Sequence, residues 1–403
     1  MTENWIKEST QKVFDEVVSW RRDLHAHPEL SYHEVGTAAK IAQLLRDFGA
    51  EEVREHVGGN GVVALIRGTG CGKGSGKVLA LRADMDALPI TEETGLPFAS
   101  QNDGVMHACG HDGHMAMALG TAKILCENRD KFAGTVKMIF QPAEEPSPTG
   151  GSRAMIEAGV MENPKVDAIM GLHLWAGGGR KVGEILVKKG VATTVTDVMQ
   201  IEVFGRAGHG SSPHLNIDAL VAGCKIVDGL QTIVSRQVDP FDTAVISVGT
   251  FQSGTVENVT SGYTKMRASV RTLSIEMREH VKKCVRNLLE GIEKIYGVTT
   301  KLDFQDGYLS IVNDGEMVDL FMDACDEQLG EGVVRVSEKP ETWGEDFCYF
   351  SNMVPGVFAI VCAGYDDDRP AYSNHNSRFD WDETAMQYGM QAELAAAMKF
   401  FER

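Results

Sequence analysis

The sequence lacks any long hydrophobic run. Its longest apolar stretches, such as GVFAIVCAG at residues 356–364, are far shorter than the roughly 20 residues that cross a bilayer as a helix. The opening MTENWIKEST also lacks the basic start and apolar stretch of a secretory signal peptide. These two absences predict a cytoplasmic protein with no membrane partner.

Positive charge is scarce. The chain has 39 Lys and Arg residues against 57 Asp and Glu residues, and a formal net charge of −18, which argues against nucleic acid and anionic membranes as partners. The eight cysteines have no paired spacing, which indicates reduced thiols rather than a disulfide framework. With 403 residues, 43% of them apolar, the chain is long enough for two domains with real cores.

The first half of the chain alternates between helical spacing and short apolar runs. Helices are predicted over residues 3–24, 34–49, 112–129 and 150–159. Buried strands are predicted within residues 61–68, 77–88, 134–145 and 167–175. This alternation is typical of an α/β domain with a mostly parallel sheet covered by helices. Ligands of such sheets gather at the carboxyl ends of the strands.

The pattern changes near residue 190. Residues 198–205 and 263–273 alternate apolar and polar side chains, which indicates strands with one face in water. Helical patterns follow at residues 216–236 and 274–296. We therefore predict an inserted α+β domain over residues 190–305, with a four-stranded sheet and two helices, inside a first domain of residues 1–189 and 306–403.

MHACGHDGH, residues 106–114, concentrates side chains that bind metals. A thiolate at Cys109 and an imidazole at His111 can turn toward one point from an irregular loop. The alternative is a polar loop that is rich in histidine by chance. Asp112 and His114 resemble groups that orient metal-bound imidazoles, and the simplest interpretation of Asp112 is a cap at the start of the following helix.

QPAEE places Glu144 and Glu145 directly after the strand TVKMIF. Two adjacent carboxylates at a strand end are costly unless positive charge lies beside them, and metal ions would supply that charge. One glutamate could then bind metal while its neighbour accepts a proton from bound water. The alternative is a solvated acidic loop.

Two further histidines follow or end apolar strands. His173 lies at the end of DAIMGLHLW, where a hydrogen-bonded core histidine is the more common finding. His375 lies in the polar loop YSNHNSRFD, where a surface histidine is the simpler interpretation.

The four segments together favour a metal centre. Each lies at or just past a predicted strand end, and together they offer Cys109, His111, Glu145, His173 and His375. This set is too large for one tetrahedral zinc ion, but it suits two ions ~3.5–4 Å apart that share a bridging ligand and a bridging water. Glu144 would complete the machinery of amide hydrolysis as a general base.

These motifs resemble those of the M20-type metallopeptidase and amidohydrolase family. The likeness is greatest to its N-acyl amino acid amidohydrolase branch, with hippurate, auxin-conjugate and aminobenzoyl-glutamate hydrolases. It runs nearly end to end, through RRDLHAHPELSYHE, LRADMDALPI, MHACGHDGHMAM, QPAEE, GLHLW, GRAGHGSSPH, ENVTSG, GEDF and NHNSRFD. The combination of HACGHD, PAEE and GLHLW is specific.

The resemblance implies two divalent metal ions per chain. Zinc or manganese is favoured, and cobalt or nickel could substitute. It implies that Cys109 bridges or nearly bridges the ions, that His111, Glu145, His173 and His375 are the other ligands, and that Glu144 is the general base.

The resemblance also implies roles for the inserted domain. His209 would steady the oxyanion, often in the active site of a partner subunit, and Asn258 and Arg271 would hold the substrate carboxylate. A guanidinium fork suits a carboxylate, although without the resemblance Asn258 and Arg271 are ordinary polar residues. The inserted domain would act as a lid and dimerisation domain, so we expect a homodimer or a higher homo-oligomer.

The sequence departs from the wider family at one motif. Many members carry His-x-Asp after a strand, whereas this chain has Asp84-Met85-Asp86, so neither aspartate is assigned as a metal ligand. Glu345 and Asp346 of GEDF are likewise left without a role.

The predicted function is two-metal hydrolysis of the amide bond of N-acyl amino acids. The alternatives are a metallo-carboxypeptidase or dipeptidase that acts on small peptides, and a non-catalytic protein that binds metal or a small ligand.

Overall fold

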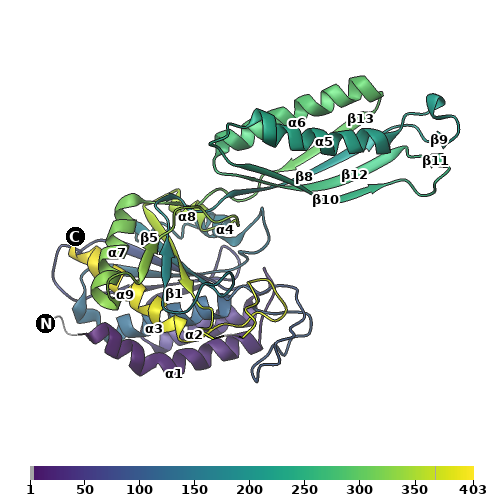
Figure 1. Ribbon diagram of the computed structural model, residues 1–403. Coiled ribbons are helices and arrows are strands. Elements are labelled where there is room, and N and C mark those ends of the chain that lie inside the picture. Colours follow the sequence, from purple (N-terminus) through teal and green to yellow (C-terminus); the bar gives the residue numbers. More distant parts are fainter. Residues whose placement is uncertain (1–3, 368) are drawn as a thin grey trace. The chain divides into compact units, whose positions relative to one another are not determined.

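The computed structural model describes residues 4–367 and 369–403, which form two compact units (Figure 1). The first unit comprises the chain up to Ala192, Ile311–Pro340 and Asp346–Arg403. The second comprises Thr193–Ser310 and Glu341–Glu345.

The first unit is built on an eight-stranded sheet with the order β1-β2-β4-β3-β5-β16-β6-β15. The strands are β1 (Glu51–Val57), β2 (Gly61–Arg67), β3 (Val78–Asp84), β4 (Thr135–Gln141), β5 (Ala168–Trp175), β6 (Ile185–Val187), β15 (Val334–Val336) and β16 (Gly356–Cys362). The central strands β4, β3, β5 and β16 run parallel to their neighbours within this group, and so do β6 and β15. The predicted mostly parallel sheet is confirmed.

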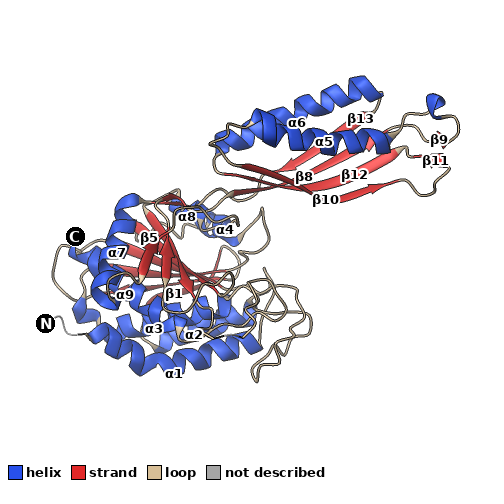
Figure 2. Cartoon of the chain, in the orientation of Figure 1, coloured by secondary structure: helices blue, strands red, loops and turns tan. Residues whose placement is uncertain are grey.

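Helices cover this sheet (Figure 2). They are α1 (Trp5–Ala26), α2 (Val35–Asp47), α3 (His111–Glu127), α4 (Gly151–Glu157), α7 (Gly315–Leu329), α8 (Cys348–Ser351) and α9 (Ala385–Glu402). Helix α3 lies between α1 and the central strands β3 and β5, so almost all of its side chains are buried. Glu3, the first residue of the first predicted helix, lies outside the described residues.

The second unit has the element order β8 (Val195–Phe204), α5 (Ala219–Gln237), β10 (Ala244–Ser253), β12 (Tyr263–Thr272), α6 (Ile275–Tyr296) and β13 (Thr299–Gln305). Its four strands form an antiparallel sheet in the order β10-β12-β8-β13. Side chains of β8 alternate between buried and half-buried, because one face of the sheet packs on α5 and α6. The predicted four-stranded sheet with two helices is confirmed.

The helices of the second unit begin at capping residues. The Asp218 carboxylate accepts hydrogen bonds from the backbone N–H of Leu220 (2.9 Å) and Val221 (3.2 Å) at the start of α5. The Ser274 hydroxyl accepts one from Met277 N–H (3.1 Å) at the start of α6. No helix among the described residues combines the length and apolarity that a membrane span needs.

We predict that Glu393 of α9 makes the stability of the first unit depend on pH. Burial raises the pKa of this carboxyl to about 7 from its ordinary 4.5, although the Thr121 hydroxyl of α3 donates a hydrogen bond to it (2.6 Å). The folded chain then binds a proton that the unfolded chain has lost, so the free energy of unfolding falls as pH rises from about 4.5 to 7. The full effect is ~3 kcal/mol.

Glu393→Gln removes this titration and keeps an acceptor for Thr121. Chemical denaturation should show equal stability of variant and wild type near pH 4.5 and a more stable variant at pH 8. Glu402→Gln, on an exposed residue of the same helix, should behave as wild type at both pH values. An equal difference between Glu393→Gln and wild type at the two pH values would contradict the prediction.

Candidate metal centre

The predicted ligands of the first unit come from segments that follow or end its strands. His173 belongs to β5, and Glu145 lies four residues beyond the end of β4. Cys109 immediately precedes Gly110, which has a left-handed φ of 91° and leads into α3 at His111. His375 also has a positive φ, 68°, and its backbone N–H donates to the Ala108 carbonyl (2.7 Å).

The structure brings all five predicted ligands together. Their donor atoms form two groups within each of which the atoms lie at most 4.8 Å apart: Cys109 with His111 and His173, and Cys109 with Glu145 and His375. Cys109 belongs to both groups. Its Sγ atom lies 3.5 Å from His173 Nε2 and 3.3 Å from His375 Nε2. A sulfur shared by two groups of donors is the arrangement that a bridging ligand requires.

Two of the imidazoles are oriented by backbone carbonyls. His111 Nδ1–H donates to the Asp86 carbonyl (2.8 Å), and His173 Nδ1–H donates to the Leu174 carbonyl (2.8 Å). Because a carbonyl only accepts, the neutral form of each ring carries its proton on Nδ1. The Nε2 lone pair is then the one available to a metal, which is the usual way in which a metal-binding histidine is held.

The acidic groups of the cluster lie close together and are largely buried. Burial raises the pKa of the Cys109 thiol, and the Glu145 carboxylate raises it further. Contacts with the Cys109 sulfur and the Glu145 carboxylate (3.4 Å) raise the pKa of His375 to about 10. The Glu145 carboxylate therefore contributes to both shifts, by disfavouring the Cys109 thiolate and favouring the charged His375 imidazole.

Among the donor atoms of this cluster that the structure describes, His111 Nε2 has no hydrogen-bond partner, and Glu145 Oε1 has none beyond the ion-pair contact with His375 Nε2 at 3.4 Å. They lie 3.9 Å apart. A buried polar atom without a partner is costly, and a metal ion would satisfy both. The donor set of one thiolate, three imidazoles and one carboxylate therefore fits divalent metal ions such as zinc.

Asp86 holds the backbone of Glu144 and Glu145 in place. Its carboxylate accepts hydrogen bonds from the backbone N–H of Glu144 (3.0 Å) and of Glu145 (3.1 Å), and from the Ser31 hydroxyl (2.6 Å). The carbonyl of the same residue orients His111. Asp86 thus holds the backbone of Glu144 and Glu145 and one ring nitrogen of His111, which is how it can serve the site without being a predicted ligand.

Glu34 supports the same loop from the start of α2. This buried carboxylate accepts hydrogen bonds from the backbone N–H of Ala143 (2.8 Å) and of Tyr32 (2.9 Å), and from the Asn60 amide (3.0 Å). Ala143 has a left-handed φ of 52°, which directs the following glutamates. Sequence reasoning missed Glu34. The HPELSYHE motif was part of the resemblance, but its partners lie elsewhere in the chain.

His114 and Asp84 form a second hydrogen-bonded pair beside the ligands. His114 Nδ1–H donates to Asp84 (2.6 Å), while His114 Nε2 accepts from the backbone N–H of Leu174 (2.8 Å). Both ring nitrogens are therefore used, so His114 supports the strand end that carries His173 rather than offering a metal ligand.

Arg82 links Asp84 to Asp346. Its guanidinium lies 2.7 Å from the Asp84 carboxylate and 3.0 Å from the Asp346 carboxylate, and Gln141 Nε2 donates to Asp346 (2.8 Å). All four side chains are fully or almost fully buried, so each charge requires these partners. A charged residue inside the apolar run LALRAD was a signal that could have found Arg82.

The predicted capping role of Asp112 is wrong. Residue Gly110, in a left-handed conformation, precedes α3, and no side chain caps this helix. The Asp112 carboxylate instead accepts hydrogen bonds from Arg21 Nε (2.7 Å) and His25 Nδ1 (2.9 Å) of α1. Buried Arg21 requires a negatively charged partner, so the Asp112 carboxylate pairs with it instead of capping the helix.

The other predicted residues belong to the second unit. His209 lies in β9 (Gly208–His209), which pairs with β11 (Val259–Thr260), and the Asn258 carbonyl accepts from Gly210 N–H (2.8 Å). The structure therefore brings His209 and Asn258 side by side on an exposed two-stranded ribbon. Arg271 lies on β12, half-buried, and donates to the Val270 carbonyl (3.0 Å). Their roles toward a substrate stay predictions.

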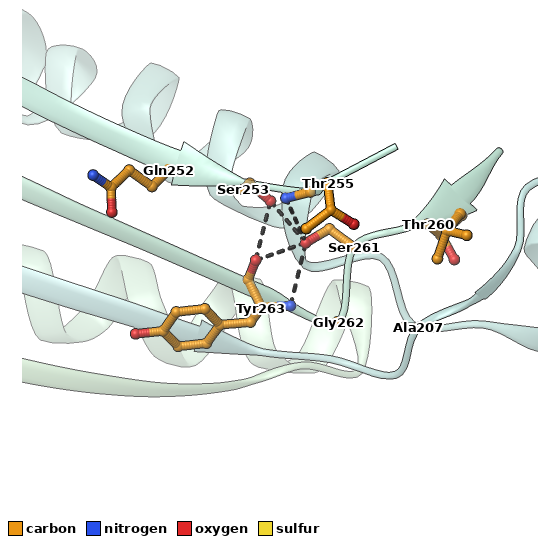
Figure 3. Close-up of a pocket in the computed structure, with 10 residues that line it drawn as sticks. Ala207, Gln252, Ser253, Thr255, Thr260, Ser261, Gly262 and Tyr263 are labelled. Atoms are coloured by element: carbon orange, nitrogen blue, oxygen red, sulfur yellow. Dashed lines mark hydrogen bonds between the residues drawn. The ribbon is translucent and has the colours of Figure 1, made fainter. Parts of the chain in front are cut away.

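A surface hollow of about 400 Å³ lies beside this ribbon (Figure 3). Its hydroxyl groups bond within the chain: Ser253 donates to Ser261 (2.9 Å), and Ser261 donates to the Tyr263 carbonyl (2.6 Å). These bonds stabilise the turn between β10 and β12. The ENVTSG motif thus has a structural part besides Asn258.

Comparison with known proteins places this chain in a family. The model of peptidase family M20/M25/M40 matches residues 80–399. The chain belongs to this family. The resemblance predicted from the motifs is confirmed, and the chain is a hydrolase of amide bonds.

Individual relatives in this family match most of the chain. An N-acyl-L-amino acid amidohydrolase of Geobacillus stearothermophilus is 42% identical over 78% of this chain and 83% of its own length. Thermostable carboxypeptidase 1 of Saccharolobus solfataricus is 38% identical over 98% of both chains. The crystal structure of the YXEP protein of Bacillus subtilis, described as a dinuclear metal binding peptidase, is 34% identical and covers 97% of this chain and 99% of its own, with a TM-score of 0.79.

Asp86→Asn tests whether the hydrogen bonds of the Asp86 carboxylate position Glu144 and Glu145. The amide keeps one acceptor but turns an N–H group toward the backbone N–H of Glu144 or Glu145. We expect metal affinity to fall by about 10–100-fold, as measured by competition with a chromophoric chelator. Asp15→Ala, on an exposed residue of α1, should leave affinity unchanged. Wild-type metal affinity in Asp86→Asn would show that these hydrogen bonds are dispensable.

Proposed function

We propose that this protein is a two-metal amidohydrolase that cleaves N-acyl amino acids into a carboxylic acid and a free amino acid. The observation that carries the proposal is the pair of donor groups that share Cys109, with a further carboxylate, Glu144, beside them. Ions held by Cys109, His111, Glu145, His173 and His375 would act as Lewis acids that polarise a carbonyl and lower the pKa of water. Zinc and manganese fit these donors best.

Glu144 is the general base of this proposal. Its side chain is only 6% exposed, and a carboxylate oxygen lies within 4.8 Å of donor atoms of His111 and Glu145. Glu144 takes a proton from the attacking water as the oxygen adds to the amide carbon. It then delivers this proton to the nitrogen as the C–N bond breaks, so the amine leaves neutral.

His209, Asn258 and Arg271 recognise the substrate in this proposal. The imidazole of His209 donates a hydrogen bond to the oxygen that becomes negative in the tetrahedral intermediate. The Arg271 guanidinium and the Asn258 amide bind the carboxylate of the amino acid product. The similarity to an N-acyl-L-amino acid amidohydrolase supports this substrate class.

The second unit acts as lid and dimerisation domain in the same proposal. Action of His209 in a partner's active site would require such a homodimer. The cytoplasmic location stays a prediction.

A peptidase that removes carboxyl-terminal residues is the second candidate. The similarity to a carboxypeptidase over nearly the whole chain favours it. The two functions share the metal centre and differ in the group on the acyl side of the amide bond. Assays of hippurate, N-acetyl amino acids and dipeptides with the metal-loaded enzyme separate them, since the larger kcat/KM identifies the substrate class. A protein that binds metal and hydrolyses none of these substrates would be the non-catalytic alternative.

Glu144→Gln tests the general base. The amide has nearly the same shape but cannot accept the proton, so we expect kcat to fall by about 10²–10⁴-fold. Metal content, measured by atomic emission, should stay at the wild-type value because Glu144 is not a proposed ligand. Near-normal turnover in Glu144→Gln would refute the assignment.

His209→Ala tests the oxyanion donor. Loss of one such donor typically costs about 10²–10³-fold in turnover, and we expect kcat to fall by this factor with metal binding unchanged. Ser235→Ala, on an exposed residue of α5, provides a matched control in the same unit. A change in KM alone would instead make His209 a substrate-binding residue.

A further inference from the structure

We propose that Ser211 is a positioning residue that fixes the tautomer of His209, so that this imidazole presents an Nε2–H donor. The catalytic consequence rests on the proposed function, whereas the tautomer itself does not.

Two groups of Ser211 contact one ring nitrogen of His209. The backbone N–H of Ser211 donates to His209 Nδ1 (3.1 Å), and the Ser211 hydroxyl oxygen lies 2.9 Å from the same nitrogen. A backbone N–H can only donate, so Nδ1 must be the acceptor. In the neutral ring the single proton is therefore on Nε2. The hydroxyl can add a second hydrogen bond to the same lone pair.

The backbone around His209 is held independently of its side chain. The His209 carbonyl accepts from Ser212 N–H (3.0 Å) and from Asn216 Nδ2 (3.2 Å). A Cβ atom on Gly208 would lie only 1.9 Å from the Asn216 side chain, so the close approach of the two segments requires glycine. The backbone contacts of the ribbon thus fix the position of the His209 backbone, and Ser211 fixes which ring nitrogen carries the proton.

This tautomer is the one that an oxyanion needs. With Nδ1 engaged, the Nε2–H group is a donor that is already oriented before negative charge develops on the carbonyl oxygen. The opposite tautomer would place a lone pair on Nε2 and repel the oxyanion. The exposed position of His209 on the ribbon leaves this donor available to a ligand.

The contacts of Ser211 could instead serve only to stabilise the turn, so the test must observe the ring itself. Full-length protein labelled with ¹⁵N-histidine is studied by long-range ¹H–¹⁵N correlation at pH 8, above the ordinary histidine pKa of ~6.5. The signals of His209 are assigned by their loss in His209→Gln. We expect a protonated Nε2 and an unprotonated Nδ1 in the wild type. A protonated Nδ1 would overturn the proposal.

Substitutions of Ser211 connect the tautomer to turnover. Ser211→Ala keeps the backbone donor and removes the hydroxyl, so the Nδ1 signal should move toward that of a mixture of tautomers. Because one hydrogen bond contributes about 1 kcal/mol, kcat should fall by roughly 3–10-fold with little change in KM. Ser211→Thr restores the hydroxyl and should restore both readouts.

Ser235→Ala again provides the control and should match the wild type in both readouts. An unchanged His209 spectrum and unchanged kcat in Ser211→Ala would reduce Ser211 to a turn residue and overturn the proposal. The spectroscopic result does not depend on hydrolysis. If the tautomer is as proposed but no amide substrate is cleaved, the proposed function fails and the positioning role remains. If amides are cleaved but Nδ1 of His209 carries the proton, the positioning role of Ser211 fails and the proposed function remains.

Discussion

The crowding of donor atoms around the Cys109 sulfur is the constraint on which the rest of this structure depends. Two imidazole nitrogens lie within 3.5 Å of this sulfur, and the Glu145 carboxylate lies 3.4 Å from one of them. Burial and the neighbouring carboxylate both disfavour the thiolate. Such a group of acidic ligands is stable in its ionised form only with cations among them. The left-handed turn at Gly110 and the strand ends of the sheet are the means by which the chain assembles it.

Two buried carboxylates of the first unit, Asp86 and Glu34, hold segments that carry the predicted ligands. The Asp86 carboxylate accepts hydrogen bonds from two backbone N–H groups, and the Asp86 carbonyl accepts one from the His111 imidazole. The Glu34 carboxylate accepts one from the backbone N–H of Ala143, the residue before Glu144. These hydrogen bonds orient the predicted ligands through groups that are not themselves predicted to bind metal. Buried polar groups of this kind do little for stability by themselves, because desolvation offsets their attraction. Their value lies in fixing the direction of the ligand atoms.

The sequence predicted the architecture and the clustering of the five candidate ligands for one shared reason. Continuous apolar runs such as DAIMGLHLW have the pattern of buried parallel strands, and polar residues at the ends of such strands meet at one edge. The sequence did not predict how Asp112 would be used, because its partners Arg21 and His25 lie about 90 residues away in the chain. Helix α7 was also missed, although Asp314 caps its start. The support that Glu34 gives to the glutamate loop could not be predicted, since it depends on a hydrogen bond with Ala143 that no local pattern encodes.

Reloading the metal-free chain with cobalt(II) tests the central claim most directly. Cobalt replaces zinc in such sites, and a thiolate bound to it gives a characteristic charge-transfer absorption. The account predicts that this band grows and saturates at two cobalt ions per chain, and that Cys109→Ser abolishes it. Saturation at less than one ion, or a band that persists in Cys109→Ser, would contradict it.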